Sequence, residues 1–189
     1  MLQVQALAIS DVKVITPSIV RDERGFFSET YSRRALDQAG VQADFVQDNQ
    51  SLSRAKGVVR GLHFQTEPFA QGKLVRVLRG SIFDVAVDIR QGSPTFGQHV
   101  SSVLSEENWS QMWVPVGFAH GFCTLEPDTE VIYKVTAFYA PQCDKGIAFD
   151  DPDLGIAWPV PRGDVVLSDK DRRHPRLRDV PAAFTYAAS

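Results

Sequence analysis

Apolar and polar side chains alternate along several short stretches of this chain. Residues 83–90 (FDVAVDIR) place four apolar side chains on one face of an extended segment and Asp84, Ala86, Asp88 and Arg90 on the other. A repeat of two residues is typical of a β-strand, because successive side chains of a strand point to opposite faces. We therefore expect a strand here, with Asp84 and Asp88 on the same face.

Other stretches carry the same signal. Residues 11–17 (DVKVITP) alternate, and residues 130–139 (EVIYKVTAFY) are rich in the β-branched and aromatic residues that strands favour. Residues 73–90 predict two strands joined by a hairpin-sized break at 79–81. Short strands separated by frequent turns indicate an all-β sandwich or barrel. The turn clusters lie at 91–94, 115–117, 126–128 and 141–142.

Only short helices are expected. Residues 33–39 (RRALDQA) predict one, with Ser32 as its N-cap and Gly40 at its end. Residues 168–173 (SDKDRR) predict a second, with Ser168 as its N-cap. The proline- and arginine-containing tail that begins at Pro175 is expected to wrap the surface.

Composition restricts the class of protein. The 189 residues are 43% hydrophobic and 23% charged, which suits one globular domain spanning residues 1–189. A net charge of −3 gives no reason to expect binding to nucleic acid, and no apolar run approaches the roughly 18–20 residues of a membrane helix. The N-terminus lacks a secretory signal, and the only cysteines, Cys123 and Cys143, form no disulfide framework. We expect a cytoplasmic protein with two reduced thiols.

One apolar stretch, residues 57–65 (GVVRGLHFQ), contains both Arg60 and His63. A lone strand histidine is most simply a core residue with one ring nitrogen bonded to backbone. Arg60 argues against a plain core strand, because a guanidinium cannot be neutralised and its burial demands an anionic partner. In a regular strand these two residues would face opposite sides. A bulge at Gly61 would turn both inward; without one, only one of them is functional.

Charged residues continue into the next two strands. Lys73 begins the first of them, and Asp84 and Asp88 share a face of the second. A barrel interior lined by His63, Arg60, lysine and aspartate is a poor core and a reasonable binding site.

A catalytic metal is not expected. The chain has four histidines, and a cupin-type metal site would place a second histidine two residues after the first, where Gln65 follows His63. Glu67 and His120 could join His63, but this is a thin ligand set. The four histidines are His63, His99, His120 and His174.

Nine segments, in this order along the chain, together resemble the dTDP-4-dehydrorhamnose 3,5-epimerase family. The resemblance covers the chain from about Asp11 to Asp171. The segments are 22–31 (DERGFFSETY), 45–53 (FVQDNQSLS), 57–65 (GVVRGLHFQ), 71–90 (QGKLVRVLRGSIFDVAVDIR), 93–98 (SPTFGQ), 113–125 (WVPVGFAHGFCTL), 133–141 (YKVTAFYAP), 150–159 (DDPDLGIAWP) and 167–171 (LSDKD).

The resemblance implies a cupin-type jelly-roll β-barrel that forms a homodimer and uses no metal or organic cofactor. It implies the substrate dTDP-4-dehydro-6-deoxy-D-glucose and the product dTDP-4-dehydro-β-L-rhamnose, in dTDP-L-rhamnose biosynthesis. Such chemistry needs no cofactor, because carbons 3 and 5 both flank a keto group and loss of either proton gives an enolate. A base, a donor to the enolate oxygen and an acid on the opposite face suffice.

The resemblance also implies roles for individual residues. His63 matches the base, and imidazole titrates near neutral pH. Asp171 matches the carboxylate that orients the ring, while strand geometry alone leaves Asp84 as an alternative. Tyr133 matches the acid, since a phenol keeps its proton at neutral pH. Taken without the resemblance, Tyr133 is more simply a sheet aromatic whose hydroxyl reaches water.

The remaining implied residues bind substrate. Lys73 and His120 would donate to the keto and sugar oxygens, and Arg60 would manage negative charge at the enolate or a phosphate. Arg24 would contact the diphosphate, and Tyr139 would stack on thymine. The implied substrate-binding set is Arg24, Glu29, Gln47, Asn49, Arg60, His120, Tyr139, Asp144 and Lys170.

The chain departs from the family pattern in two places. Gln50 stands where histidine is frequent, and residues 137–139 (AFY) replace a polar residue followed by two tyrosines. These departures keep open a relative that epimerises one carbon only. Two further alternatives are a non-catalytic sugar-nucleotide-binding cupin, against which the retention of His63 and Tyr133 counts, and a metal-dependent cupin.

Overall fold

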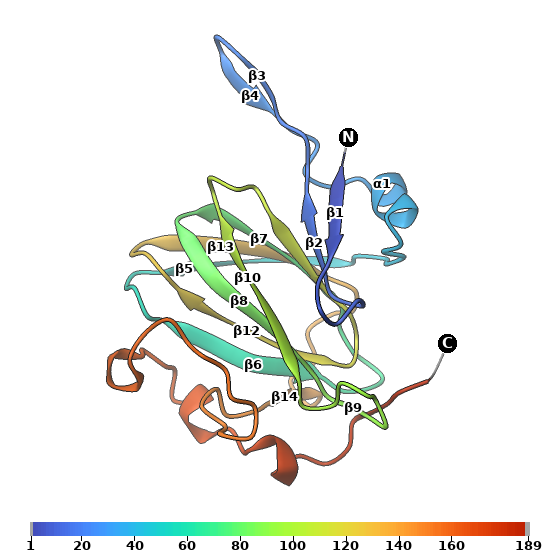
Figure 1. Ribbon diagram of the computed structural model, residues 1–189, viewed down its shortest axis with the longest axis vertical. Coiled ribbons are helices and arrows are strands. Elements are labelled where there is room, and N and C mark those ends of the chain that lie inside the picture. Colours follow the sequence, from blue (N-terminus) through green and yellow to red (C-terminus); the bar gives the residue numbers. More distant parts are fainter. Residues whose placement is uncertain (1, 188–189) are drawn as a thin grey trace.

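Two antiparallel β-sheets pack face to face in the computed structural model, which describes residues 2–187 (Figure 1). This arrangement confirms the all-β, cupin-type jelly-roll fold. One sheet has six strands in the order β1 (Gln3–Ala6), β2 (Lys13–Thr16), β11 (Gln111–Val114), β7 (Lys73–Arg79), β13 (Thr129–Val135) and β5 (Gln47–Ser53). The other has five, in the order β10 (His99–Ser105), β8 (Ser81–Asp88), β12 (Phe118–Thr124), β6 (Val59–Gln65) and β14 (Asp144–Gly146).

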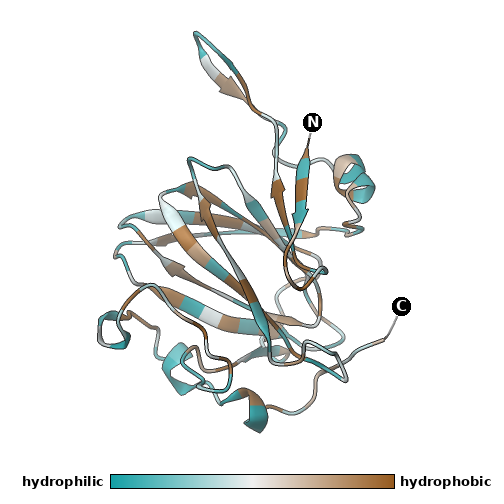
Figure 2. Ribbon diagram, viewed as in Figure 1, coloured by the Kyte–Doolittle hydropathy of each residue, from teal (hydrophilic) through white to brown (hydrophobic). Residues whose placement is uncertain are grey.

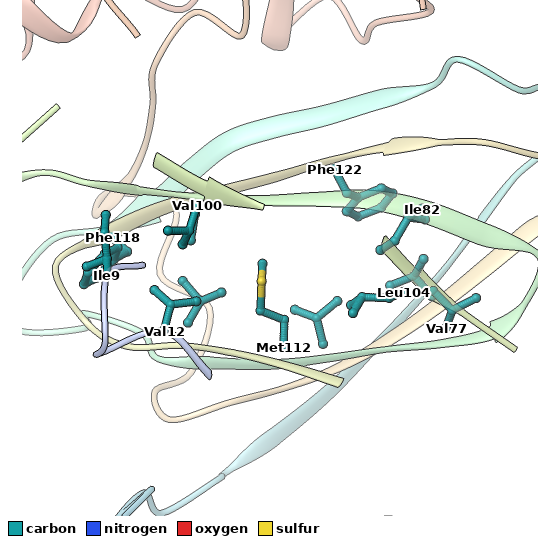
Figure 3. Close-up of a cluster of buried hydrophobic side chains, with 13 residues drawn as sticks. Ile9, Val12, Val77, Ile82, Val100, Leu104, Met112, Phe118 and Phe122 are labelled. Atoms are coloured by element: carbon teal, nitrogen blue, oxygen red, sulfur yellow. The ribbon is translucent and has the colours of Figure 1, made fainter. Parts of the chain in front are cut away.

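The main core fills the space between the sheets. Alternate residues of each strand point inward, so Val75 and Val77 of β7 share one apolar cluster with Ile82 and Ala86 of β8. Figure 3 shows Val77 and Ile82 among the side chains of this cluster. Burial of each valine or isoleucine in this layer stabilises the fold by about 1.5–3 kcal/mol. Other members of this cluster are Ile9, Val12, Val100, Leu104, Met112, Val114, Phe118, Phe122 and Val131.

The expected alternation of β8 is present, and both of its faces are buried. Ala86 faces the core between the sheets, whereas Val85 and Val87 face outward. The C-terminal segment covers that outer face with side chains that include Leu177 and Phe184 (Figure 1). This confirms that the tail from Pro175 wraps the surface. The segment also adds β15 (Phe184–Thr185), which pairs in parallel with β9 (Arg90–Gln91).

The predicted hairpin at 79–81 is wrong in its pairing. The break is where the sequence places it, but β7 and β8 belong to different sheets, so the chain crosses from one sheet to the other there. Gly80 makes the crossing with φ of 75°, and a Cβ at this position would lie 2.6 Å from Oγ1 of Thr129. Turn signals locate such a break but do not say which strands pair across it.

The helices are short, as expected. α1 (Arg33–Gln38) follows Ser32, whose side chain makes no capping hydrogen bond. The predicted second helix is reduced to the 3₁₀ turn η2 (Asp171–Arg173), and two further turns are η1 (Arg162–Asp164) and η3 (Leu177–Asp179). Within residues 2–187, no helix has the length and apolar character needed to cross a membrane.

A two-stranded hairpin projects away from the barrel (Figure 1). It consists of β3 (Val20–Asp22) and β4 (Gly25–Phe27). Phe26 and Phe27 are 59% and 73% exposed, so the hairpin presents apolar surface to solvent (Figure 2).

A β-bulge in β6 brings two of its polar residues to the same cavity. His63 pairs with His120 and Arg60 pairs with Phe122, so three steps along β6 match two steps along β12. The extra residue allows Arg60 and His63 to line the same cavity, so of the two alternatives that Gly61 left open the structure has the bulge. Gly61 has φ of 130°, and a Cβ there would lie 2.5 Å from Cα of Gly121.

Replacing Gly61 with alanine should therefore destabilise the fold. Backbone strain of about 1–3 kcal/mol and overpacking of about 1–3 kcal/mol should together lower the free energy of unfolding by about 2–5 kcal/mol. Urea denaturation measures this change. Gly163→Ala is the matched control, because a Cβ at Gly163 meets no atom within 4 Å and should change stability by less than about 0.5 kcal/mol. Equal stabilities for the two variants would contradict the close contact between β6 and β12.

Candidate active site

Two adjoining cavities of about 180 and 230 Å³ open between the sheets, and His63, Lys73 and Tyr133 line both of them. His63 comes from the five-stranded sheet, whereas Lys73 and Tyr133 come from the six-stranded sheet. Lys73 shares the inward face of β7 with Val75, and Tyr133 packs against the main core. The polar site is thus a continuation of the apolar layer, built on the same inward-facing positions.

His63 is held by Asp171, which lies 108 residues further along the chain. Nε2 of His63 is 2.5 Å from Oδ1 of Asp171. Because an ionised carboxylate only accepts hydrogen bonds, Nε2 carries the hydrogen and Nδ1 keeps the lone pair that can take a proton. Ser168 fixes the carboxylate, donating to Oδ2 at 2.8 Å and accepting from the Asp171 backbone N–H at 3.1 Å.

The carboxyl of Asp171 remains ionised despite its burial. Burial alone would raise its pKa, but the hydrogen bond and charge of His63, together with the Ser168 hydroxyl, outweigh burial and lower the pKa. An anion at this position stabilises the imidazolium that forms when His63 accepts a proton. The pair has the properties required of a general base and its orienting group.

Asp84, the alternative partner, binds a different histidine. Its Oδ1 is 2.7 Å from Nε2 of His120, and both side chains are buried. His120 nevertheless reaches the cavity of about 230 Å³ beside His63. Asp84 thus pairs with His120, and the structure places Asp171 rather than Asp84 beside His63.

Lys73 is a buried cation beside the base. Burial lowers its pKa from 10.5 to about 8, while the negative charges of Asp144 and Asp84 oppose the change and Lys170 adds to it. Its Nζ donates to the backbone carbonyl of His63 at 3.4 Å. At neutral pH most molecules carry an ammonium group here, close enough to the cavity to stabilise a developing oxyanion.

Tyr133 keeps its proton. Burial raises the pKa of its hydroxyl, Arg60 lowers it, and Asp144 raises it again, with a net increase above 10. A neutral phenol that faces the cavity from the sheet opposite His63 can donate a proton.

Arg60 lines the cavity but is not buried, so one premise of the sequence argument is wrong. Its side chain is exposed and takes no carboxylate partner among the described residues. Nε donates to Oγ of Ser53 at 3.3 Å, and one terminal nitrogen donates to the Leu52 carbonyl at 3.3 Å. The guanidinium lies at the rim, where solvent supplies its remaining hydrogen bonds.

The cavity of about 180 Å³ brings together the polar residues expected to bind the nucleotide sugar. Gln47 and Asn49 sit on the inward face of β5, and the Gln47 amide donates to Oδ1 of Asn49 at 2.8 Å. The Tyr139 hydroxyl donates to Asp144 at 3.1 Å, and Lys170 forms an ion pair with the same carboxylate. The Tyr139 ring remains 57% exposed, which leaves a face free for stacking.

Two predicted residues lie elsewhere. Arg24 sits at the turn of the projecting hairpin, where its guanidinium binds Asp22. Glu29 lines a separate cavity of about 610 Å³ between α1 and the first two strands. Within one chain, neither residue lines the cavities that contain His63, so their contact with the nucleotide stays a prediction.

Sequence reasoning missed three residues around the site. Gln65 is 4% exposed and clamps the loop after β13, donating to the Phe138 carbonyl and accepting from the Ala140 N–H. Ser168 was interpreted only as a helix cap, although its hydroxyl also orients Asp171. His174 lies with His63 and Asp171 in one cluster. For Gln65 the signal was present, since it follows His63 by two residues in the same strand.

The two departures from the family pattern lie outside the cavities. Gln50 alternates away from Asn49 on β5 and donates to Glu130 instead. Phe138 is 60% exposed and lines neither cavity. Neither change alters the surroundings of His63, Lys73 or Tyr133.

The chain is similar to known proteins over almost its whole length. A protein from Sinorhizobium fredii, named dTDP-4-dehydrorhamnose 3,5-epimerase, is 53% identical over 96% of this chain and 93% of its own length. The crystal structure of an epimerase from Legionella pneumophila in complex with dTDP-4-keto-L-rhamnose covers 100% of both chains at 46% identity, with a TM-score of 0.94. A 3′-monoepimerase from Streptomyces bikiniensis, in complex with dTDP-quinovose, covers 91% of this chain and 86% of its own at 34% identity, with a TM-score of 0.83.

The family model described as dTDP-4-dehydrorhamnose 3,5-epimerase matches residues 6–179. With this match over most of the sequence and relatives near 50% identity across nearly their whole length, the chain belongs to the dTDP-4-dehydrorhamnose 3,5-epimerase family.

Proposed function

We propose that this protein epimerises dTDP-4-dehydro-6-deoxy-D-glucose at carbons 3 and 5, giving dTDP-4-dehydro-β-L-rhamnose without a cofactor. One observation carries the proposal: His63 and Tyr133 face a shared cavity from opposite sheets. A sugar ring held between them meets a base on one face and an acid on the other. Removal of a proton from one face and its return to the other inverts the carbon.

The steps follow from the groups present. Nδ1 of His63 removes the proton from a carbon next to the keto group, and Asp171 stabilises the resulting imidazolium. The electron pair moves to the keto oxygen, and the Lys73 ammonium stabilises the enolate. Tyr133 then donates its proton to the same carbon from the other face. His63 then releases its proton to solvent and Tyr133 takes one up from solvent, and a rotation or shift of the ring presents the second carbon to the restored pair.

The subunit arrangement proposed for this enzyme is a homodimer. The projecting hairpin exposes Phe26 and Phe27 and carries Arg24 at its turn. A second copy that covers these apolar side chains would also receive a cationic residue beside its nucleotide site. We also propose a cytoplasmic location, consistent with the free thiols of Cys123 and Cys143 and testable by cell fractionation.

Solvent-proton exchange tests the proposed reaction. The protein is incubated with the substrate in heavy water, and deuterium at each ring carbon is followed by NMR. Label at carbons 3 and 5 is expected, and His63→Ala should abolish it while nucleotide binding persists. Label at one carbon alone would indicate a mono-epimerase. Binding of nucleotide without any label would indicate a non-catalytic binding protein and would refute the reaction proposed here.

Tyr133→Phe should separate exchange from inversion. His63 can still remove a proton and return a deuteron to the same face, but the opposite face has lost its donor. We expect label in recovered substrate with at most about 1% of wild-type epimerised product, in keeping with the 10²–10⁴-fold contribution of a general acid. Tyr31→Phe is the control, because Tyr31 packs in a different cluster with Phe45. Wild-type product formation by Tyr133→Phe would leave Tyr133 as a packing residue only.

The alkaline limit of activity should follow Lys73. As pH rises through about 8, the ammonium loses its proton and the enolate loses its charged donor, so kcat/KM should fall with an apparent pKa near 8. Lys73→Arg should move this limit to higher pH, and Lys73→Met should lower kcat about 10²–10³-fold at pH 7. Lys134→Met is the control, because Lys134 binds Asp48 away from the cavities. If the limit near pH 8 persisted in Lys73→Arg, the titration that causes it would belong to another group.

The hairpin should control the oligomeric state. Sedimentation equilibrium of the wild-type protein should give twice the chain mass of 21.0 kDa. Combined Phe26→Ser and Phe27→Ser substitutions should shift the equilibrium toward monomer, because they remove the apolar surface that a second copy would cover. Val103→Ser, on the outer face of β10 and 48% exposed, should remain dimeric. A wild-type monomer, or a dimer unaffected by both serines, would rule out the proposed interface.

A further inference from the structure

A second histidine stands against the carboxylate of the proposed catalytic pair. Nε2 of His174 is 3.2 Å from Oδ1 of Asp171, the same oxygen that accepts from His63. The orientation of this contact does not meet hydrogen-bond geometry, so Nε2 of His174 has no hydrogen-bond partner among the described residues. A buried ring nitrogen without a partner costs free energy and calls for an explanation.

The fold holds His174 firmly in this place. Its side chain is 9% exposed, and its ring lies on Gly146 of β14, where a Cβ would come within 2.4 Å of the ring. The rings of His63 and His174 are 5.4 Å apart at 79° to one another, with Asp171 between their nitrogens. In its neutral form, an imidazole held in this position offers the lone pair of Nε2 to a metal ion.

Two imidazole nitrogens and one carboxylate oxygen thus lie close together. All three donor atoms lie within 4.8 Å of one another. Two histidines with one carboxylate, completed by water, form a typical donor set for zinc, with bonds of about 2.0–2.2 Å. Such bonds separate tetrahedral donors by about 3.4 Å. The 3.2 Å between His174 and Asp171 already fits, and His63 would have to withdraw by about 0.9 Å toward the open cavity.

We propose that His63, Asp171 and His174 form an inhibitory Zn²⁺ site that competes with the catalytic use of His63. Zinc must take the lone pair of Nε2 of His63, so the hydrogen of the neutral ring resides on Nδ1. A ring with Nδ1 protonated and Nε2 bound to metal cannot accept a proton from the sugar. Asp171 simultaneously loses its hydrogen bond to His63. The proposal about inhibition rests on the proposed role of His63 as the base, whereas the proposal about binding does not.

Cobalt absorption tests the site without any turnover. Co²⁺ titrated into the full-length protein should give one equivalent of bound metal with visible d–d bands, and Zn²⁺ should displace it. His174→Phe, which retains a flat ring over Gly146, should weaken binding at least about tenfold. His63→Asn should also lose the bands. The test of the site therefore does not depend on correct folding of His174→Phe alone. His99→Gln is the matched control, because His99 lies on β10 and lines neither active-site cavity.

Inhibition is measured in the deuterium-exchange assay. Zn²⁺ should suppress exchange by the wild-type protein, and a chelator should restore it. The half-inhibitory concentration should rise at least about tenfold in His174→Phe, relative to that variant's own metal-free rate, and remain unchanged in His99→Gln. Absent cobalt bands, or bands and inhibition that His174→Phe leaves unchanged, would overturn the site. Metal binding that leaves exchange intact would overturn the inhibition. A protein that binds cobalt through His174 but shows no exchange without metal would instead refute the proposed reaction and leave the metal site standing.

Discussion

The backbones of Gly61 on β6 and Gly121 on β12 lie against each other so closely that neither position has room for a side chain. This contact permits the bulge that gives β6 one residue more than β12 between two paired positions. Without the bulge, Arg60 and His63 would point in opposite directions, because strand side chains alternate. The position of the ring of His63, and with it the choice of Asp171 as partner, follows from this local constraint.

The second constraint is electrostatic. Between the sheets, the inward-facing positions change from valine and leucine to lysine, aspartate, histidine and tyrosine along the same strands. Buried ionisable groups are costly unless they are paired. Here Asp84 binds His120 and Asp171 binds His63, whereas Lys73 has a backbone carbonyl but no carboxylate in direct contact, and its pKa is lowered. The positive charge of Lys73 is therefore the one that the protein balances least. The negative charge of the proposed enolate would balance it.

Much of the fold could be predicted from the sequence, because the positions of strands and turns depend on local patterns. Alternation located β8, and Gly61 between two polar residues made a bulge one of two alternatives for β6. The pairing of strands and of charged side chains could not be predicted, because it depends on residues that are distant in sequence. Thus the break at Gly80 was located but given the wrong partner strands, and the residues alone could not choose between Asp84 and Asp171. Burial was misjudged for Arg60, whose strand reaches the rim of the cavity, and nothing in the sequence placed His174 beside the site.

The partner of His63 lies in a short 3₁₀ turn near the end of the chain, 108 residues away. Every strand of the two large sheets ends at or before Gly146, so the barrel can be synthesised in full before Asp171 leaves the ribosome. A translation product that stops between these two points contains His63, Lys73 and Tyr133 but lacks the carboxylate that orients the ring. Synthesis of the C-terminal segment is therefore the step at which a nascent barrel acquires its complete base.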